Sequence, residues 1–172
     1  SQMSSEHNIL ASDAVRRLRH EGWIGELQGI LLTYANLEGV DLSYANLKSA
    51  KLVYSNLKSV NIPRSILDNA EITETNFHNA VMHSASFRKA NFFAEQSGHY
   101  LLKDADLIDA NFEGATFKGE ASGEWSESEH IHLQEAKRLR GAIMPNGKKY
   151  DGRYYLQGDI VEAQSRNYDL NN

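Results

Sequence analysis

The chain has 172 residues, of which 41% are hydrophobic and 24% charged, and its formal net charge is −5. This composition is that of one globular domain, and the absence of cysteine excludes disulfides, thiolate metal sites and cysteine nucleophiles. No apolar run approaches the ~20 residues of a membrane span, and the N-terminus lacks the apolar core of a signal peptide. We therefore expect a cytoplasmic protein.

The first segment, residues 1–24, is predicted to be a tail followed by a capping helix. In the stretch SDAVRRLRHEG, Ser12 stands at a favourable N-cap position and Gly22 follows the last turn. Val15, Leu18 and Trp23 would cover the apolar end of the domain that follows.

Residues 25–119 place an apolar residue at every fifth position. Neither regular structure keeps such residues on one side, because five helical steps turn a side chain by roughly 140° and five strand steps move it to the opposite face. The pattern therefore predicts a chain that turns a corner once per pentad, with a small residue two positions before each apolar one on the same inward side. The predicted core is Leu37, Leu42, Leu47, Leu52, Leu57, Ile62, Leu67, Ile72, Phe77, Met82, Phe87, Phe92, Leu107, Phe112 and Phe117.

The repeat is interrupted once, in FFAEQSGHYLLKD, where residues 95–99 make a broken pentad. Segments that depart from the local rule are where function tends to lie. The candidate partner surface here is Phe93, His99 and Tyr100; the alternative is a bulged corner whose apolar groups pack against the coil. Tyr34 and Tyr54, expected at one outward edge, form a second candidate patch because tyrosine is enriched at interfaces; the alternative is that they simply repeat the same position of the pentad.

Residues 120–172 are predicted to form a helix-turn-helix-like extension that caps the preceding domain. SESEHIHLQEAKRLRG has a capping box, Ser126 and Glu129, and ends at Gly141. MPNGKKY predicts a turn, and GDIVEAQSR predicts a short final helix opened by Asp159.

The pentad cores ANLEG, ANLKS, ADLID and ANFEG resemble those of the pentapeptide-repeat protein family. The resemblance implies an all-β solenoid, a right-handed quadrilateral β-helix with four pentads per coil, to which short capping α-helices at both ends would be added. LRGAIMPNGKKYDGR is similar to a terminal segment of some bacterial members. Stacking of residues twenty apart then predicts the pairs Glu38–Lys58, Tyr44–Arg64 and Asn36–Asn56, the series Lys48, Asp68 and Arg88, and an inner column of Leu52, Ile72, Phe92 and Phe112.

Nothing in the sequence indicates catalysis. It contains no G-x-S-x-G, no phosphate-binding glycine loop and no dinucleotide fingerprint. His130 and His132 would point to different sides of a helix, and Asp104, Asp106 and Asp109 lack calcium-loop spacing. A filled solenoid also has convex walls. We predict a non-enzyme without catalytic, cofactor-binding or metal-binding residues.

The expected function is a non-catalytic protein-binding or scaffolding module with an unidentified protein partner. The alternative, which the resemblance alone implies, is a DNA-mimicking modulator of topoisomerase (gyrase). Residues 25–119 hold 8 basic and 11 acidic side chains, which is too balanced for a DNA mimic and too acidic for direct nucleic-acid binding. No membrane partner is expected, and the sequence leaves open whether the chain forms a homodimer.

Overall fold

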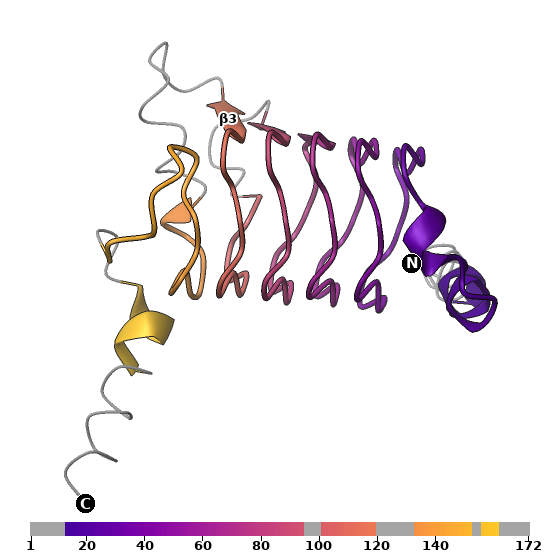
Figure 1. Ribbon diagram of the computed structural model, residues 1–172, viewed down its shortest axis with the longest axis horizontal. Helices are drawn as coiled ribbons and strands as arrows, with labels where there is room; N and C mark the ends of the chain where they lie inside the picture. The colour runs from indigo at the N-terminus through magenta and orange to yellow at the C-terminus, as the bar shows by residue number, and fades with distance from the viewer. Residues whose placement is uncertain (1–12, 95–100, 120–132, 153–155, 162–172) are drawn as a thin grey trace, which may run out of the picture.

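The computed structural model describes residues 13–94, 101–119, 133–152 and 156–161, which build a solenoid of stacked coils (Figure 1). Parallel bridges join residues twenty apart, as in Leu31 with Lys51 and Asp41 with Asn61. One coil therefore consists of four pentads, and each residue lies beside its equivalent in the next coil. The helical residues 13–20 lie at one end of the stack and the C-terminal segments at the other.

Each pentad ends in a tight turn. In the first coil the N–H of Ala35 donates to the carbonyl of Leu32 at 3.1 Å, and Tyr34 between them has a φ of 58°, as at the third position of a type II turn. A left-handed conformation costs an L-residue about 1–2 kcal/mol. Here it directs the N–H of Tyr34 to the carbonyl of Val53 in the next coil, at 2.9 Å.

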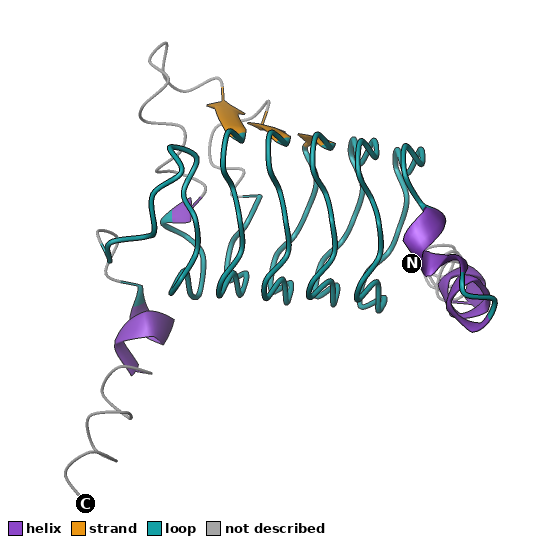
Figure 2. Ribbon diagram, in the orientation of Figure 1, coloured by secondary structure: helices purple, strands orange, loops and turns teal. Residues whose placement is uncertain are grey.

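One side of the solenoid carries the strands β1 (Glu71–Thr73), β2 (Asn91–Ala94) and β3 (Thr116–Gly119). They form a parallel sheet in the order β1-β2-β3, seen as a row along one edge of the coils in Figure 2. Bridges from Leu31 to Lys51 and from Lys51 to Glu71 extend this row toward the N-terminal end. We call this side, from Leu31 to β3, the sheet face.

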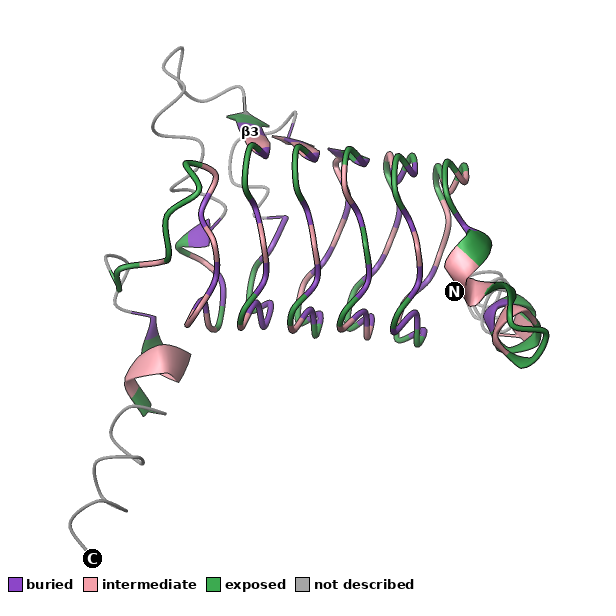
Figure 3. Cartoon of the chain, viewed as in Figure 1, coloured by how far each residue is buried: buried purple, intermediate pink, exposed green. Residues whose placement is uncertain are grey.

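The interior is a continuous apolar column, and each coil alternates buried and exposed residues (Figure 3). Every residue of the predicted core from Leu37 to Phe117 is at most 4% exposed, whereas Leu32 of the first coil is only partly buried. In the second half the column is aromatic: the rings of Phe92 and Phe117 stack at 4.5 Å, and those of Phe87 and Phe112 at 5.2 Å. The predicted column through Phe92 and Phe112 is wrong, because Phe117 follows Phe92 in the register.

The register changes at the interruption. Glu71 pairs with Asn91, twenty residues on, but Asn91 pairs with Thr116 and Val81 with Asp106, twenty-five residues on. The interrupted coil therefore contains five residues more than a regular one. The five additional residues lie between Phe93 and Leu101, because the Glu74 N–H donates to the Phe93 carbonyl nineteen residues on and the Phe77 N–H to the Leu101 carbonyl twenty-four residues on. The broken pentad at 95–99 stays a prediction. Residues 95–100 themselves lie outside the described ranges.

A further part-coil lies where the sequence predicted a helix. Parallel bridges join Asp106 to Arg138 and Asn111 to Ile143, and Leu139 and Met144 are buried. The described part of the helix predicted over 126–140 is thus wrong beyond Leu133. The apolar residues at 133, 136 and 139 have a helical spacing. Stacking instead provides this segment with hydrogen-bond partners on the preceding coil: the Leu107 N–H donates to the Arg138 carbonyl at 3.0 Å.

Both ends carry short helical segments. Residues 13–20 are helical, Gly22 has a φ of 77°, and the 3-10 helix η1 (Trp23–Glu26) follows. Val15 is buried, but Trp23 is 59% exposed and does not cover the first coil as predicted. Ser12 lies outside the described residues. At the other end, residues 157–161 are helical, so Asp159 lies within this segment and does not open it.

The helices in the described ranges are all too short or too polar to cross a bilayer.

Candidate functional site

Two tyrosines form an exposed, stacked aromatic pair on the surface of the solenoid. Tyr34 is 73% exposed and Tyr54 39%, and their rings stack 5.2 Å apart at an interplanar angle of 6°. Both have a left-handed φ, 58° and 55°, at equivalent turns of neighbouring coils. Leu31, which is 70% exposed, lies in the same column of pentads on the sheet face, three residues before Tyr34. We call these three residues the tyrosine corner.

A third exposed tyrosine, Tyr44, lies half a coil away from Tyr34 and has a polar partner. The Arg64 guanidinium donates from Nη1 to Tyr44 Oη at 3.0 Å, and its Cζ lies 5.8 Å from the centre of the Tyr44 ring. The predicted stacking of this pair is present. Because Arg64 occupies the hydroxyl and covers one side of the ring, Tyr44 differs chemically from the tyrosine corner.

The predicted surface at the interruption is only partly described. Phe93 lies in β2 and is half-buried between Thr73 and Lys118 of the neighbouring strands. His99 and Tyr100 lie outside the described residues. The two predicted patches share the sheet face, because Phe93 and the tyrosine corner belong to the same column of pentads.

Ion pairs join opposite charges on adjacent coils. Lys58 lies 3.7 Å from Glu38, as the twenty-residue stacking predicts, and Lys51 and Glu71 are 3.4 Å apart. The Asn36–Asn56 amide pair is also present at 3.1 Å. Arg88 differs from the prediction: its backbone N–H donates to Asp68 at 3.0 Å, whereas its guanidinium pairs with Glu113 at 3.1 Å.

One carboxylate is almost fully buried. Asp106 is 6% exposed; His83 Nε2 lies 2.8 Å from its Oδ2, and the Arg138 guanidinium donates to the same oxygen. Burial alone would raise the pKa of Asp106, but the hydrogen bonds and positive charges of His83 and Arg138 outweigh it and hold the pKa below its ordinary value of 3.8.

Sequence reasoning missed this cluster because it assigned Arg138 to a helix. The spacing of two between Ala142 and Met144, directly after Gly141, is the signal that could have placed Arg138 in a coil. Asp106, considered beforehand only with Asp104 and Asp109 along the chain, is thus part of an ion-paired group. Within the described ranges, no three His, Asp or Glu side chains converge in a way that could hold a metal ion.

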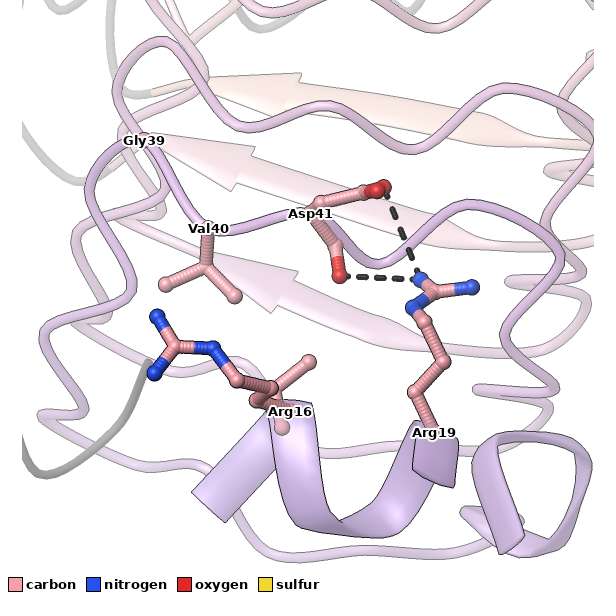
Figure 4. Close-up of a pocket in the computed structure, with 6 residues that line it drawn as sticks. Arg16, Arg19, Gly39, Val40 and Asp41 are labelled. Atoms are coloured by element: carbon pink, nitrogen blue, oxygen red, sulfur yellow. Dashed lines mark hydrogen bonds and ion pairs between the residues drawn. The ribbon is translucent and has the colours of Figure 1, made fainter. Parts of the chain in front are cut away.

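A pocket of ≈ 330 Å³ lies between the helical residues 13–20 and the first coil (Figure 4). Its charges have partners within the molecule: Arg16 pairs with Asp13 at 2.9 Å, and Arg19 lies 3.5 Å from Asp41 Oδ1. Burial opposes ionisation of Asp41, yet the pKa of Asp41 is lowered by hydrogen bonds from Ser43 and Asn61 and by the charge of Arg19. Because these charges are paired with each other, the pocket offers no net charge that would attract a charged ligand.

The family model for pentapeptide repeats matches residues 30–69 and 55–92, with eight copies. Residues 30–92 of the chain are pentapeptide repeats. Comparison with curated proteins found no match.

Solved pentapeptide-repeat structures are similar to the chain. Rfr23 of the cyanobacterium Cyanothece 51142 is 28% identical, with a TM-score of 0.46 over 53% of this chain and 57% of that one. HetL of Nostoc sp. strain PCC 7120, involved in heterocyst differentiation regulation, is 24% identical, with a TM-score of 0.35 over 72% and 61%. QnrB1, a plasmid-mediated fluoroquinolone resistance protein, is 15% identical, with a TM-score of 0.30 over 83% and 86%. The chain spans less than two thirds of the first two.

Proposed function

We propose that this pentapeptide-repeat protein is a non-catalytic protein-binding or scaffolding module that presents its sheet face to a protein partner. The observation that carries the proposal is the tyrosine corner, in which Tyr34 and Tyr54 are stacked and exposed on a rigid framework. Tyrosine supplies a large amphipathic contact area with few rotatable bonds, and it is enriched where partners bind. The mutual stacking fixes both rings before binding, which reduces the entropy lost on association.

The coil itself supports this role. We infer that it has the right-handed, four-sided form of pentapeptide-repeat proteins, because four turns recur in each twenty-residue period. Such a repeat offers flat sides along the stack. The interrupted pentad, residues 95–99, comes directly after β2 in the sequence, and we include it in the proposed contact.

The absence of catalysis, cofactors and metals is part of the proposal. Its support is that the buried carboxylate Asp106 is held by the Arg138 guanidinium and the His83 imidazole and that the charges of Arg19 and Asp41 in the pocket pair with each other. We also propose a cytoplasmic protein that binds neither nucleic acid nor membranes directly, since residues 25–119 carry no basic stripe.

Modulation of gyrase by DNA mimicry is the weaker alternative. A mimic needs a continuous negative potential, whereas Glu38, Glu71 and Glu113 each pair with a lysine or arginine of an adjacent coil. Inhibition of gyrase supercoiling by micromolar wild-type protein would favour this alternative over scaffolding.

The test is affinity capture from native host lysate, followed by titration of the purified partner. The Tyr34→Ser, Tyr54→Ser double variant should lose the partner, with at least a ten-fold rise in Kd for two central contacts. The matched control is Tyr44→Ser, which removes an exposed tyrosine from another corner and should bind normally. Equal binding by all three proteins would refute the tyrosine corner, and capture of nothing by wild type would remove the basis for scaffolding.

A further inference from the structure

The sheet face presents two outward rows of side chains. Its inward residues, such as Leu52 and Ile72, are fully buried, so the residues on either side of them point away from the core. The pairing between coils makes each row run along the stack with one residue per coil. The first row is Leu31, Lys51, Glu71, Asn91 and Thr116, and the second row is Thr33, Val53, Thr73, Phe93 and Lys118.

The second row is uncharged up to Phe93. Val53, Thr73 and Phe93 are half-buried, which leaves a shallow strip of β-branched and aromatic side chains. At its N-terminal end stand Leu31, 70% exposed, and Tyr34, 73% exposed. Apolar groups gathered along one face are typical of a surface that a partner covers. A flat sheet face packs well against another sheet face about 10 Å away.

The adjoining face that contains Asn36 has a different character. Its outward side chains include the hydrogen-bonded amides of Asn36 and Asn56 and the ion pair of Glu38 with Lys58. Burial of this face would remove amides and charges from water without the strip of apolar groups that the sheet face offers. The sheet face is therefore the better docking surface of the two.

Lys51 and Glu71 determine which partner fits the sheet face. They lie in the first row on adjacent coils, each about half exposed, with Lys51 Nζ 3.4 Å from Glu71 Oε2. Consider a second copy turned by 180° about an axis that is parallel to the strands and midway between these two coils. Its Glu71 lies opposite Lys51, and its Lys51 lies opposite Glu71. The four charges then alternate in sign around a square, so each has an opposite charge on both chains.

The same rotation matches the uncharged residues. It places Val53 opposite Thr73 of the second copy, and Leu31 opposite Asn91, so that the two strips cover each other. A rotation about the solenoid axis would instead place Lys51 opposite Val53, and each charge would lose water without gaining an opposite charge from the second copy. The charge pattern therefore favours the arrangement in which the two solenoids are antiparallel.

We propose that the partner of the sheet face is a second copy of this chain, packed face to face in an isologous two-fold contact. The inference rests on the proposed function, because it uses the same face and identifies the partner. Rows that cross five coils at about 4.8 Å per coil give a contact about 19 Å long. A contact of this length is at the small end of specific interfaces, so the dimer is reversible and its population rises with concentration.

The test is sedimentation equilibrium of the purified full-length chain from about 10 μM to about 1 mM. Wild type should pass from monomer to dimer over this range. Lys51→Glu and Glu71→Lys should each weaken dimerisation at least ten-fold, because each places like charges opposite each other twice. An equimolar mixture of the two variants should form a 1:1 dimer. The double variant Lys51→Glu, Glu71→Lys should dimerise like wild type.

The matched control is Lys58→Glu. It breaks the pair of Lys58 with Glu38 on the adjoining face, which also joins neighbouring coils and has a distance of 3.7 Å. This variant should dimerise like wild type. Exposed ion pairs contribute little to folding, and thermal melting checks that each variant is folded before the masses are compared.

Three results would overturn the inference. They are wild type that stays monomeric up to the highest concentration, a mixture of Lys51→Glu and Glu71→Lys that does not regain the dimer, and dissociation of Lys58→Glu to the same extent as Lys51→Glu. Capture of a different protein through Tyr34 and Tyr54 is measured separately, so failure of the dimer and failure of the proposed function are distinguishable.

Discussion

Asp106 and Arg138 form an ion pair that joins the last coil to the one before it. The Asp106 carboxylate is 6% exposed and accepts from the Arg138 guanidinium, while His83 of the preceding coil approaches the same oxygen at 2.8 Å. One side chain thus links three successive coils. Removal of one member of such a pair leaves an unbalanced charge in a poorly solvated position.

Asp106→Asn is therefore expected to lower the free energy of unfolding at pH 7 by about 3 kcal/mol. Because the folded-state pKa of Asp106 is below its ordinary value of 3.8, its contribution is fully present above that pH and is lost as the pH falls through the folded-state pKa. Urea denaturation from pH 7 to pH 3 should show the difference between wild type and variant narrowing at the acid end.

The control for this pH dependence is Asp13→Asn, which removes an exposed ion pair with Arg16 and should change stability by less than about 1 kcal/mol. A gap between wild type and Asp106→Asn that stays constant over the whole pH range would contradict the lowered pKa.

Gly141 is expected to accept a side chain only if the Asp109 carboxylate moves. Its φ is 77°, and a Cβ atom there would lie 1.9 Å from Asp109 Oδ1. Gly141→Ala should lower stability by more than the about 1–2 kcal/mol of a left-handed L-residue. The matched control is Gly39→Ala, whose φ is 69° but whose Cβ would meet nothing within 4 Å.

A further substitution separates the two costs at Gly141. Asp109→Ala in the Gly141→Ala background should recover the steric part and leave the backbone part, as measured by thermal melting. If Gly141→Ala and Gly39→Ala prove equally stable, the close packing of Asp109 on the last coil is wrong.

Leu57→Asp tests the inward register directly. Leu57 is fully buried, and an unpaired carboxylate in its place should abolish the cooperative transition. Ser59→Asp places the same group at an exposed turn two residues away and should leave the melting temperature within a few degrees of wild type. Similar melting of the two variants would refute the register.

The five-residue pattern identified the core because each pentad is a local unit, whose inward residue follows from sequence spacing alone. It also placed Tyr44 beside Arg64 before the interruption. The register after Phe92 could not be predicted from spacing. Leu102 keeps its place in the five-residue pattern whether the interrupted pentad forms one side of a coil or is extra to it. The pairing of Phe92 with Phe117 depends on that choice.

The last coil was missed for a related reason. Leu133, Ala136 and Leu139 fit a helical spacing as well as a coil, and the choice depends on backbone groups of Leu107 and Asp109 that lie far away in sequence. Because the coil was missed, the cluster of Asp106, His83 and Arg138 was missed as well. Local pattern therefore predicted the repeat, whereas the contacts between non-repeating segments needed the three-dimensional register.

Deletion of residues 95–99 tests the assignment of the interruption as an addition. The deletion joins Ala94 to Tyr100, so that Leu101 and Leu102 continue a regular pentad, and coils on both sides keep their observed partners. Shortening a connection changes closure entropy by only about 0.6 kcal/mol per two-fold change in length, so the melting temperature should be unchanged or slightly higher. Deletion of residues 75–79, an equally long pentad that includes the buried Phe77, should instead shift every later residue to a different side and unfold the protein. Equal damage from both deletions would show that residues 95–99 occupy a side of the coil.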